Sequence, residues 1–334
     1  MPRPTLKPLV CQTVVITGAT SGIGLVTTRL LSRKGAKLLL IARSEDALSK
    51  LCEELRTAGG TAEYAVADVA DRAQVEAAAA KAHEKFGGFD TWINNAGAAI
   101  YGRLDTVPEE DQRRLFDVVY WGVVHGTLVA AETLKTRGGA IINVGSMLGE
   151  FAIPYQGTYC AAKFAVKGFT EAFRREAYAA RHRISLTLIK PAAIDTPIIE
   201  HARNLIGSKG TRHPVPTYHP DLVARAIAHA CEHPLRDIVV GGAGGLAVAV
   251  SNSVAPRAMD FLLSRLGRVM QTSRKPGVTA RRDSLYEPRE DLSERSSLNP
   301  LTRKTSLVLE AQLNPAAAAS TMLRLGGRML PRRR

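Results

Sequence analysis

Hydrophobic and polar positions follow two alternating periods over the first 240 residues. Short aliphatic and β-branched runs, such as TVVIT at 13–17, end at glycine or a polar residue and are typical of strands buried on both faces. Between them, apolar residues recur every three or four positions, as in helices that cover a sheet. The pattern predicts strands at 13–17, 37–41, 62–67, 91–94, 140–144, 185–189 and 237–240. It predicts helices at 23–34, 45–58, 72–86, 108–134, 159–181 and 220–232.

Strands and helices alternate strictly in this pattern, and the connections between them are short. Such alternation predicts βαβ units and therefore a parallel sheet with helices on both faces. Seven strands are enough for one doubly wound α/β domain, which we place at residues 1–250. The chain is thus expected to hold one large domain rather than two.

The pattern changes beyond residue 250. Apolar residues at 255, 258, 259, 262, 263, 266, 269 and 270 predict an amphipathic helix over 251–270, with arginines at 257, 265 and 268 between them. Such a helix packs on the body or on a second subunit, or it lies on a membrane surface through residues 255–270. Residues 271–334 are rich in Ser, Pro, Arg and acids and are expected to form a basic, flexible tail, with a weak helix at 316–330. The uncharged stretch at 238–256 is too short and glycine-rich for a transmembrane helix.

The net charge of +14 belongs largely to this tail. Residues 271–334 hold 13 Lys and Arg against 6 acids, and 13 − 6 = +7 is half of the total. The aromatic content of 5% argues against stacking platforms for nucleic acid, so no nucleic-acid partner is expected. The four cysteines form no metal-binding or CxxC spacing, and the N-terminus has no signal-peptide pattern. Reduced thiols and a cytoplasmic location, with peripheral membrane contact as an option, are expected.

A glycine-rich turn follows the first predicted strand. It reads Thr17-Gly-Ala-Thr-Ser-Gly-Ile-Gly24 and leads into the first predicted helix. Glycines let the backbone approach a pyrophosphate, whose charge then lies at the helix N-terminus. Because the turn stands between a strand and a helix, it predicts a dinucleotide site. Its expected binding residues are Gly18, Thr20, Ser21, Gly22, Ile23 and Gly24.

The end of the second predicted strand bears on the choice of dinucleotide. An NAD site normally has an acid there, but this chain has Ala42 followed by Arg43 and Ser44. A guanidinium suits a 2′-phosphate, and the Ser44 hydroxyl can donate a further hydrogen bond. The sequence therefore favours NADP(H) over NAD(H). The alternative is that Arg43 stacks on adenine without selecting for phosphate.

Two further polar segments follow strand ends. Asp68 and Val69 come after the third predicted strand, and Asn94-Asn95-Ala96-Gly97 follow the fourth. An open parallel sheet places its ligand crevice at the carboxyl ends of its strands. We therefore expect Asp68, Val69, Asn95, Ala96 and Gly97 to line the cofactor site.

Ser146, Tyr159 and Lys163 carry the candidate chemistry. Tyr159 and Lys163 are four residues apart and so share one helical face, while Ser146 follows the fifth predicted strand. A free tyrosine ionises near pH 10, and a neighbouring ammonium and the positive charge of an oxidised nicotinamide are both expected to lower that pKa. Tyr159 is then a general acid/base, and Ser146 can hydrogen-bond the substrate oxygen.

Taken together, these motifs resemble the short-chain dehydrogenase/reductase family over residues 10–245. The resemblance rests on TGxxxGxG at 17–24, NNAG at 94–97 and YxxxK at 159–163 with Ser146. It implies a Rossmann-type fold, NAD(P) as sole cofactor, no metal, and homo-oligomers built from long helices. It also implies cofactor contacts for Pro191, Ile194, Thr196, Tyr159 and Lys163.

Two positions depart from the family pattern. Val119 stands where typical members have an asparagine that completes a water-linked proton relay through the active-site lysine. Ala192 replaces the glycine of a Pro-Gly turn and adds a methyl group near the nicotinamide pocket. The relay is the feature that Val119 puts in question.

The leading hypothesis is an NADP(H)-dependent oxidoreductase that transfers hydride between nicotinamide and a carbonyl or secondary alcohol. Its substrate is expected to be small and apolar, bound under the loop from Ile194 to Tyr218. Two alternatives are an NADP(H)-binding sensor with little turnover, suggested by Val119, and a membrane-associated scaffold that acts through the basic tail.

Overall fold

The fold is built around one seven-stranded sheet in which all neighbouring strands are parallel. The computed structural model describes residues 4–206, 209–212, 214–276, 283–298 and 300–316. The strand order is β11-β7-β6-β4-β1-β2-β3. The strands are β1 (Thr13–Thr17), β2 (Lys37–Ala42), β3 (Thr61–Val66), β4 (Thr91–Asn94), β6 (Gly139–Val144), β7 (Ile184–Pro191) and β11 (Asp237–Val240). The predicted fold class is confirmed, and the strand order reverses between β1 and β4, where such sheets open a ligand crevice.

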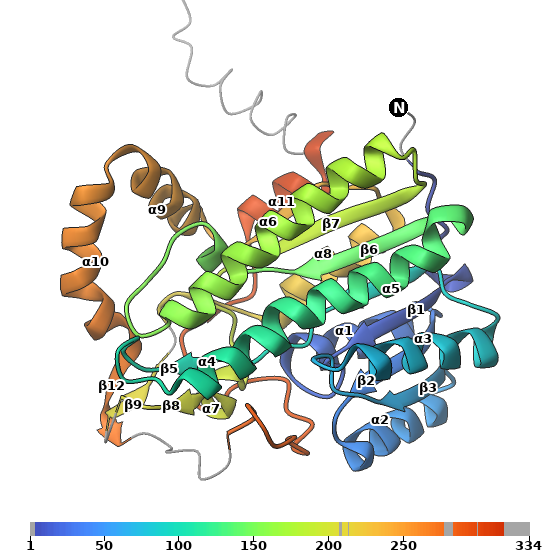
Figure 1. Cartoon of the computed structure of the whole chain (residues 1–334), viewed down its shortest axis with the longest axis horizontal. Helices are drawn as coiled ribbons and strands as arrows, with labels where there is room; N and C mark the ends of the chain where they lie inside the picture. The colour runs from blue at the N-terminus through green and yellow to red at the C-terminus, as the bar shows by residue number, and fades with distance from the viewer. Residues whose placement is uncertain (1–3, 207–208, 213, 277–282, 299, 317–334) are drawn as a thin grey trace, which may run out of the picture.

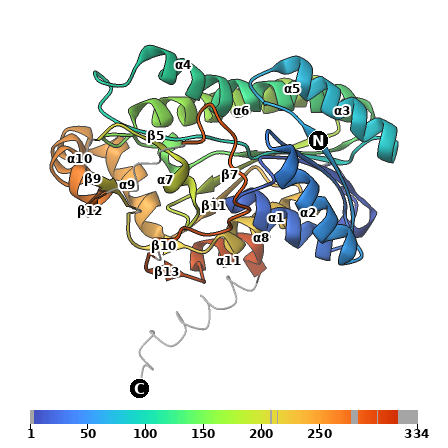
Figure 2. The same ribbon diagram turned by 90° about the horizontal axis from the view of Figure 1, so that it is seen from below.

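Helices cover both faces of the sheet (Figures 1 and 2). In Figure 2, α3, α4, α5 and α6 lie on one face, and α1, α2 and α8 lie on the other. Their bounds are α1 (Gly22–Arg33), α2 (Glu45–Thr57), α3 (Arg72–Phe86), α4 (Glu109–Phe116), α5 (Gly122–Arg137), α6 (Gly157–Ala179) and α8 (Pro220–Glu232). The helix predicted at 108–134 is divided, because a π-helical segment, η2 (Asp117–Trp121), joins α4 to α5.

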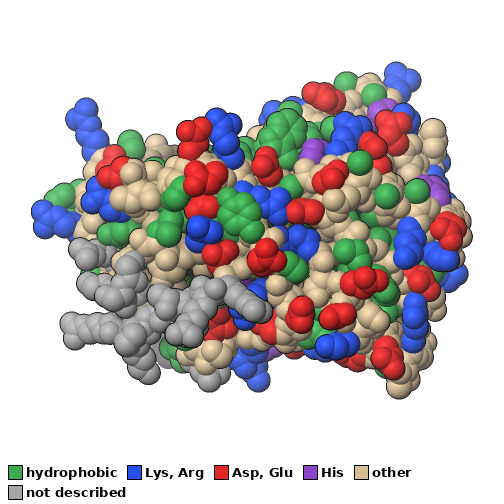
Figure 3. Space-filling model, turned by 60° about the horizontal axis from the view of Figure 1, so that its bottom comes forward, with side chains coloured by type: hydrophobic (Ala, Val, Ile, Leu, Met, Phe, Trp, Pro, Cys, Tyr) green, Lys and Arg blue, Asp and Glu red, His purple; other side chains and the backbone are tan. Residues whose placement is uncertain are grey.

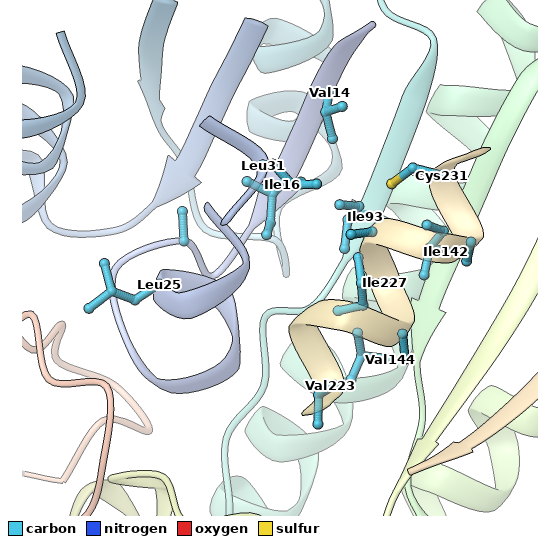
Figure 4. Packing of buried hydrophobic residues seen from close by; sticks show 14 of the residues in the cluster. Val14, Ile16, Leu25, Leu31, Ile93, Ile142, Val144, Val223, Ile227 and Cys231 are labelled. Carbon is cyan, nitrogen blue, oxygen red and sulfur yellow. The ribbon is translucent and has the colours of Figure 1, made fainter. Parts of the chain in front are cut away.

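The core between α8 and the sheet fixes the strand ends that carry the site. Figure 4 shows Val223, Ile227 and Cys231 of α8 directed toward side chains of β1, β4 and β6, among them Ile93 and Ile142. All five are almost completely buried. Each fully buried aliphatic side chain contributes roughly 1.5–3 kcal/mol. None of the four cysteines is paired in a disulfide.

A helical hairpin projects beside the body at the left of Figure 1. It consists of α9 (Ala243–Val254) and α10 (Pro256–Gln271). The amphipathic helix predicted at 251–270 corresponds to α10, whereas α9 was not predicted because Gly244 and Gly245 and the lack of a polar face hide its period. Within the described ranges, no helix is both long enough and apolar enough to span a bilayer.

Short elements complete the fold around the sheet. They are η1 (Leu9–Cys11), β5 (Ile100–Tyr101), η3 (Met147–Gly149), α7 (Ile198–His201), β8 (Arg203–Asn204), β9 (Lys209–Thr211), β10 (Thr217–Tyr218), β12 (Thr272–Pro276), β13 (Thr302–Arg303) and α11 (Leu307–Leu313).

The described part of the C-terminal region is packed on the body rather than loosely draped. β13 pairs with β10, and Leu309 and Leu313 of α11 are buried in the core beside α8. Residues 283–297, called the strap below, run along the sheet's carboxyl edge. The expectation of a flexible tail is therefore wrong for 283–298 and 300–316, because a few widely spaced apolar anchors hold a segment of polar composition. Residues 317–334, with most of the weak helix predicted at 316–330, lie outside the described residues.

Candidate active site

One cavity of about 240 Å³ lies at the carboxyl ends of the central strands. It brings together most of the residues singled out from the sequence. Those lining it are Gly18, Thr20, Ser21, Gly22, Ile23, Arg43, Ser44, Asp68, Val69, Asn95, Ala96, Gly97, Ser146, Tyr159, Lys163, Pro191, Ala192 and Thr196. Gly24 and Ile194 do not line it: Gly24 lies beneath the turn, and Ile194 is buried in the core.

The glycine-rich turn packs too closely against its surroundings for side chains. Gly18 has a φ of +66°, and a Cβ on Gly24 would lie 1.9 Å from the Gly18 carbonyl oxygen. The Asn95 side-chain amide donates to the carbonyls of Thr17 and Gly18, each at 3.1 Å. The turn is thus held as a bare-backbone cradle at the start of α1, and this fits the binding of a pyrophosphate.

Arg43 and Ser44 lie at the far end of the cavity, after β2. The Ser44 hydroxyl caps α2 by accepting a hydrogen bond from the Ala47 amide at 3.2 Å. The Asp68 carboxylate forms an ion pair with Arg114. The side chains of Ser44 and Asp68 therefore have structural partners in addition to their place at the cavity wall.

Ser146, Tyr159 and Lys163 meet at the same cavity, as their spacing predicts. Ser146 begins η3, and its hydroxyl accepts from the Leu148 amide at 3.0 Å. Lys163 Nζ donates to the Val144 carbonyl at 2.8 Å and lies 5.6 Å from the centre of the Tyr159 ring. The carbonyl at the end of β6 thereby fixes the ammonium beside the phenol.

Burial dominates the ionisation of this group. It raises the pKa of Tyr159 to about 12, while a hydrogen bond with Ser146 acts in the opposite direction. It lowers the pKa of Lys163 to about 8. The pKa of Tyr159 is raised because removing the phenolate from water outweighs the stabilising hydrogen bond from Ser146. At neutral pH the Tyr159 hydroxyl is therefore protonated.

Val119 lies in the π-helical segment η2 and is completely buried in the core. Its neighbour Val118 lines the cavity instead. A hydrocarbon side chain at 119 offers no hydrogen bond to water. The side chain at 119 therefore cannot hold a water beside Lys163, whose ammonium donates to the Val144 carbonyl.

The cavity is also lined by residues that were not among the expected site residues. Val118, Pro197, Ile198 and His201 line it from η2 and from the region of α7, and Ser284, Pro288 and Arg289 line it from the strap. The first four fall within or beside segments already linked to the site. The strap residues carry no local signal, since they are polar or proline and lie more than 80 residues from the nearest predicted site residue.

The family assignment agrees with this geometry. Residues 12–205 match the family model described as short chain dehydrogenase. This match covers more than half of the chain, and the chain belongs to the short chain dehydrogenase family. It is therefore an oxidoreductase of that type.

Individual relatives extend the comparison beyond the matched region. An uncharacterized oxidoreductase of Bacillus subtilis (strain 168), YxnA, is 38% identical over 319 residues, covering 95% of this chain and 89% of that protein. A short chain dehydrogenase/reductase from Burkholderia phymatum, solved with NAD, aligns with a TM-score of 0.69 and 27% identity over 76% of this chain and 96% of that one. A short chain dehydrogenase from Burkholderia cenocepacia J2315, solved with NADP, gives 0.64 and 26% over 77% and 99%.

Proposed function

We propose that the protein is an NADP(H)-dependent oxidoreductase that interconverts a carbonyl compound and its alcohol. The observation that carries this proposal is that Ser146, Tyr159 and Lys163 face the same cavity as the glycine-rich turn. A nucleotide on the turn and a substrate at Tyr159 would thus be held within one site. The solved relatives with NAD and with NADP support a nicotinamide nucleotide of either kind.

The chain's own residues would position the substrate and move one proton. When bound, the nicotinamide supplies or accepts the hydride. In the direction of reduction, the Tyr159 hydroxyl donates its proton to the substrate oxygen as negative charge develops there. The Ser146 hydroxyl donates a hydrogen bond to the same oxygen, and the Lys163 ammonium stabilises the phenolate left behind. The raised pKa of Tyr159 keeps the donor protonated before the reaction.

A substrate panel tests the proposal against a sensor that binds nucleotide without turnover. We would follow NADPH and NADH oxidation by absorbance with aldehydes and ketones of increasing apolar size. Turnover is expected with at least one apolar carbonyl. Nucleotide binding without turnover across the panel, shown by fluorescence, would favour the sensor and implicate Val119.

The preference for NADP(H) depends on Arg43. Its guanidinium is half-buried at the cavity wall, where paired charge-assisted hydrogen bonds to a 2′-phosphate are worth about 1.5–3 kcal/mol each. Arg43→Ala should weaken NADPH binding by at least about tenfold and change NADH binding little. Arg72→Ala, which removes an exposed arginine from α3, is the matched control. Equal losses of affinity for NADPH and NADH would refute the role of Arg43 in binding the 2′-phosphate.

We further propose that the α9–α10 hairpin touches an anionic membrane surface. It exposes large apolar side chains at Leu246, Val250, Val254, Phe261, Leu262, Leu266, Val269 and Met270. Arg257 and Arg265 flank the apolar side chains of α10 and have no ion pair among the described residues. A basic amphipathic surface of this kind suits anionic headgroups.

The hairpin also borders the substrate end of the site, which favours an apolar substrate. A Cβ on Gly245 of α9 would lie 3.6 Å from the Met147 side chain, next to Ser146.

Phe261→Asp should reduce co-sedimentation with vesicles containing phosphatidylserine, since it places a charge in the apolar surface. Leu307→Asp, at an exposed leucine of α11, should not. Equal binding by both variants would contradict the membrane proposal, and dimer loss in Phe261→Asp alone would assign the hairpin to a subunit interface.

A further inference from the structure

The strap accepts hydrogen bonds from the Arg43 guanidinium, the group that is expected to select the cofactor. Each terminal nitrogen of Arg43 donates to two strap carbonyls, at 2.5–3.3 Å. The four acceptors belong to consecutive residues: Ser284, Leu285, Tyr286 and Glu287. The four N–H bonds of the two terminal nitrogens are therefore all engaged, although these are the bonds that a fork-like grip on a phosphate requires.

The strap also accepts a hydrogen bond from the backbone amide at the start of α1. The Gly22 amide donates to the Ser293 carbonyl at 2.8 Å. Free amides at a helix N-terminus are the groups that bind phosphate in dinucleotide sites. Partially negative strap carbonyls thus contact cationic or positively polarised groups at two separate places along the cavity.

Side-chain contacts hold the strap in this position. Leu285 is buried in the core between the sheet and α3–α5, and the Tyr286 hydroxyl donates to Asp111 at 3.0 Å. The Arg114 Nε donates to the Leu285 carbonyl at 3.1 Å, and the Ser284 amide donates to the His201 carbonyl at 2.8 Å.

The far end of the strap is fixed by ion pairs. Arg295 binds the fully buried Asp195 carboxylate at 2.6 Å, and Glu294 binds Arg29 of α1 at the same distance. Figure 3, which brings the bottom of Figure 1 forward, shows acidic and basic side chains interspersed over this face. The strap is thus an ordered cover, fastened at both ends, and not a loose tail.

We propose that the strap and the 2′-phosphate of a bound nucleotide compete for Arg43. With the strap in place, Arg43 cannot offer a phosphate its paired terminal N–H bonds. Binding of a 2′-phosphorylated nucleotide therefore displaces residues 284–287 from Arg43, whereas a nucleotide without that phosphate leaves them bonded to it. The strap then sets how strongly the enzyme prefers NADP(H). The smaller the fraction of molecules in which the strap is open, the lower the apparent affinity for NADP(H). The inference rests on the proposed nucleotide site but requires no turnover.

Hydrogen–deuterium exchange on the full chain tests this competition. The probes are 2′,5′-ADP and 5′-AMP, which differ in the 2′-phosphate, each at a saturating level set by calorimetry. Peptides covering 284–291 should exchange at least about fivefold faster with 2′,5′-ADP than with 5′-AMP, because the Ser284 amide loses its partner. Unchanged or slower exchange with bound 2′,5′-ADP would overturn the proposal.

A strap variant gives a second, independent measurement. Leu285→Ala removes the buried anchor and should tighten 2′,5′-ADP by roughly tenfold while leaving 5′-AMP unchanged. Leu307→Ala, at an exposed side chain of α11, should change neither affinity. If Leu285→Ala does not fold, Tyr286→Phe, which loses only the bond to Asp111, should give a smaller shift in the same direction.

The outcomes separate the strap from the proposed function. Equal shifts for both nucleotides, or none, would overturn the competition. Binding of 5′-AMP alone by wild type and variant would overturn the competition and the NADP(H) preference, yet leave the nucleotide site intact. Binding of neither nucleotide would contradict the nucleotide site itself.

Discussion

Replacing Gly24 with alanine should damage the nucleotide cradle even though alanine favours helices. The added Cβ would lie 1.9 Å from the Gly18 carbonyl oxygen and 2.6 Å from the Asn95 side-chain nitrogen. Non-bonded heavy atoms normally lie about 3.5 Å apart, so α1 and the turn must separate by roughly 1.5 Å. Overpacking of this kind costs about 1–3 kcal/mol. The displaced turn should weaken nucleotide binding by at least about tenfold.

The assay combines NADPH binding by fluorescence with thermal unfolding. Gly168→Ala is the matched control, because Gly168 lies in α6 with nothing within 4 Å of its Cβ position. That variant should be stabilised by up to about 1 kcal/mol and bind NADPH normally. If Gly24→Ala matched wild type in both affinity and melting temperature, the close packing of the cradle would be refuted.

Two further predictions concern ionisation and assembly. The kcat/KM for carbonyl reduction should fall above about pH 8, because burial lowers the pKa of Lys163 to about 8 and the ammonium is lost there, while Tyr159 stays protonated up to about pH 12. A pH profile that is flat to about pH 10, the usual lysine range, would contradict this assignment. The resemblance implies a homo-oligomer, and the exposed Phe164 on the long helix α6 fits such an interface. Phe164→Glu should therefore lower the mass measured by light scattering, and an unchanged mass would exclude Phe164 from the interface.

Local patterns were sufficient to predict the sheet and the grouping of the candidate catalytic residues. The glycine-rich turn must follow a strand and begin a helix, and the spacing of Tyr159 and Lys163 places both on one helical face. These relations depend on neighbours a few residues apart. The sequence therefore predicted the seven strands of the sheet and the meeting of Ser146 with Tyr159 and Lys163.

Features that depend on distant contacts were not predictable from those patterns. Arg43 contacts carbonyls more than 240 residues away, and Asp195 is paired with Arg295, a hundred residues away. No period in the strap encodes these contacts. The π-helical segment at 117–121 was also missed, since its valines keep an apolar pattern that resembles an uninterrupted helix. The effect of burial on the pKa of Tyr159 was not predicted either, because the degree of burial cannot be read from a sequence.

The most direct test of the central claim compares wild type with Tyr159→Phe in carbonyl reduction. The variant keeps the ring but lacks the proton, so its NADPH turnover should fall by at least about a hundredfold. Its affinity for NADPH should remain within about twofold, since the hydroxyl contributes one modest hydrogen bond at most. A Tyr159→Phe enzyme that reduced the same substrate at the wild-type rate would contradict the role of Tyr159 as the proton donor.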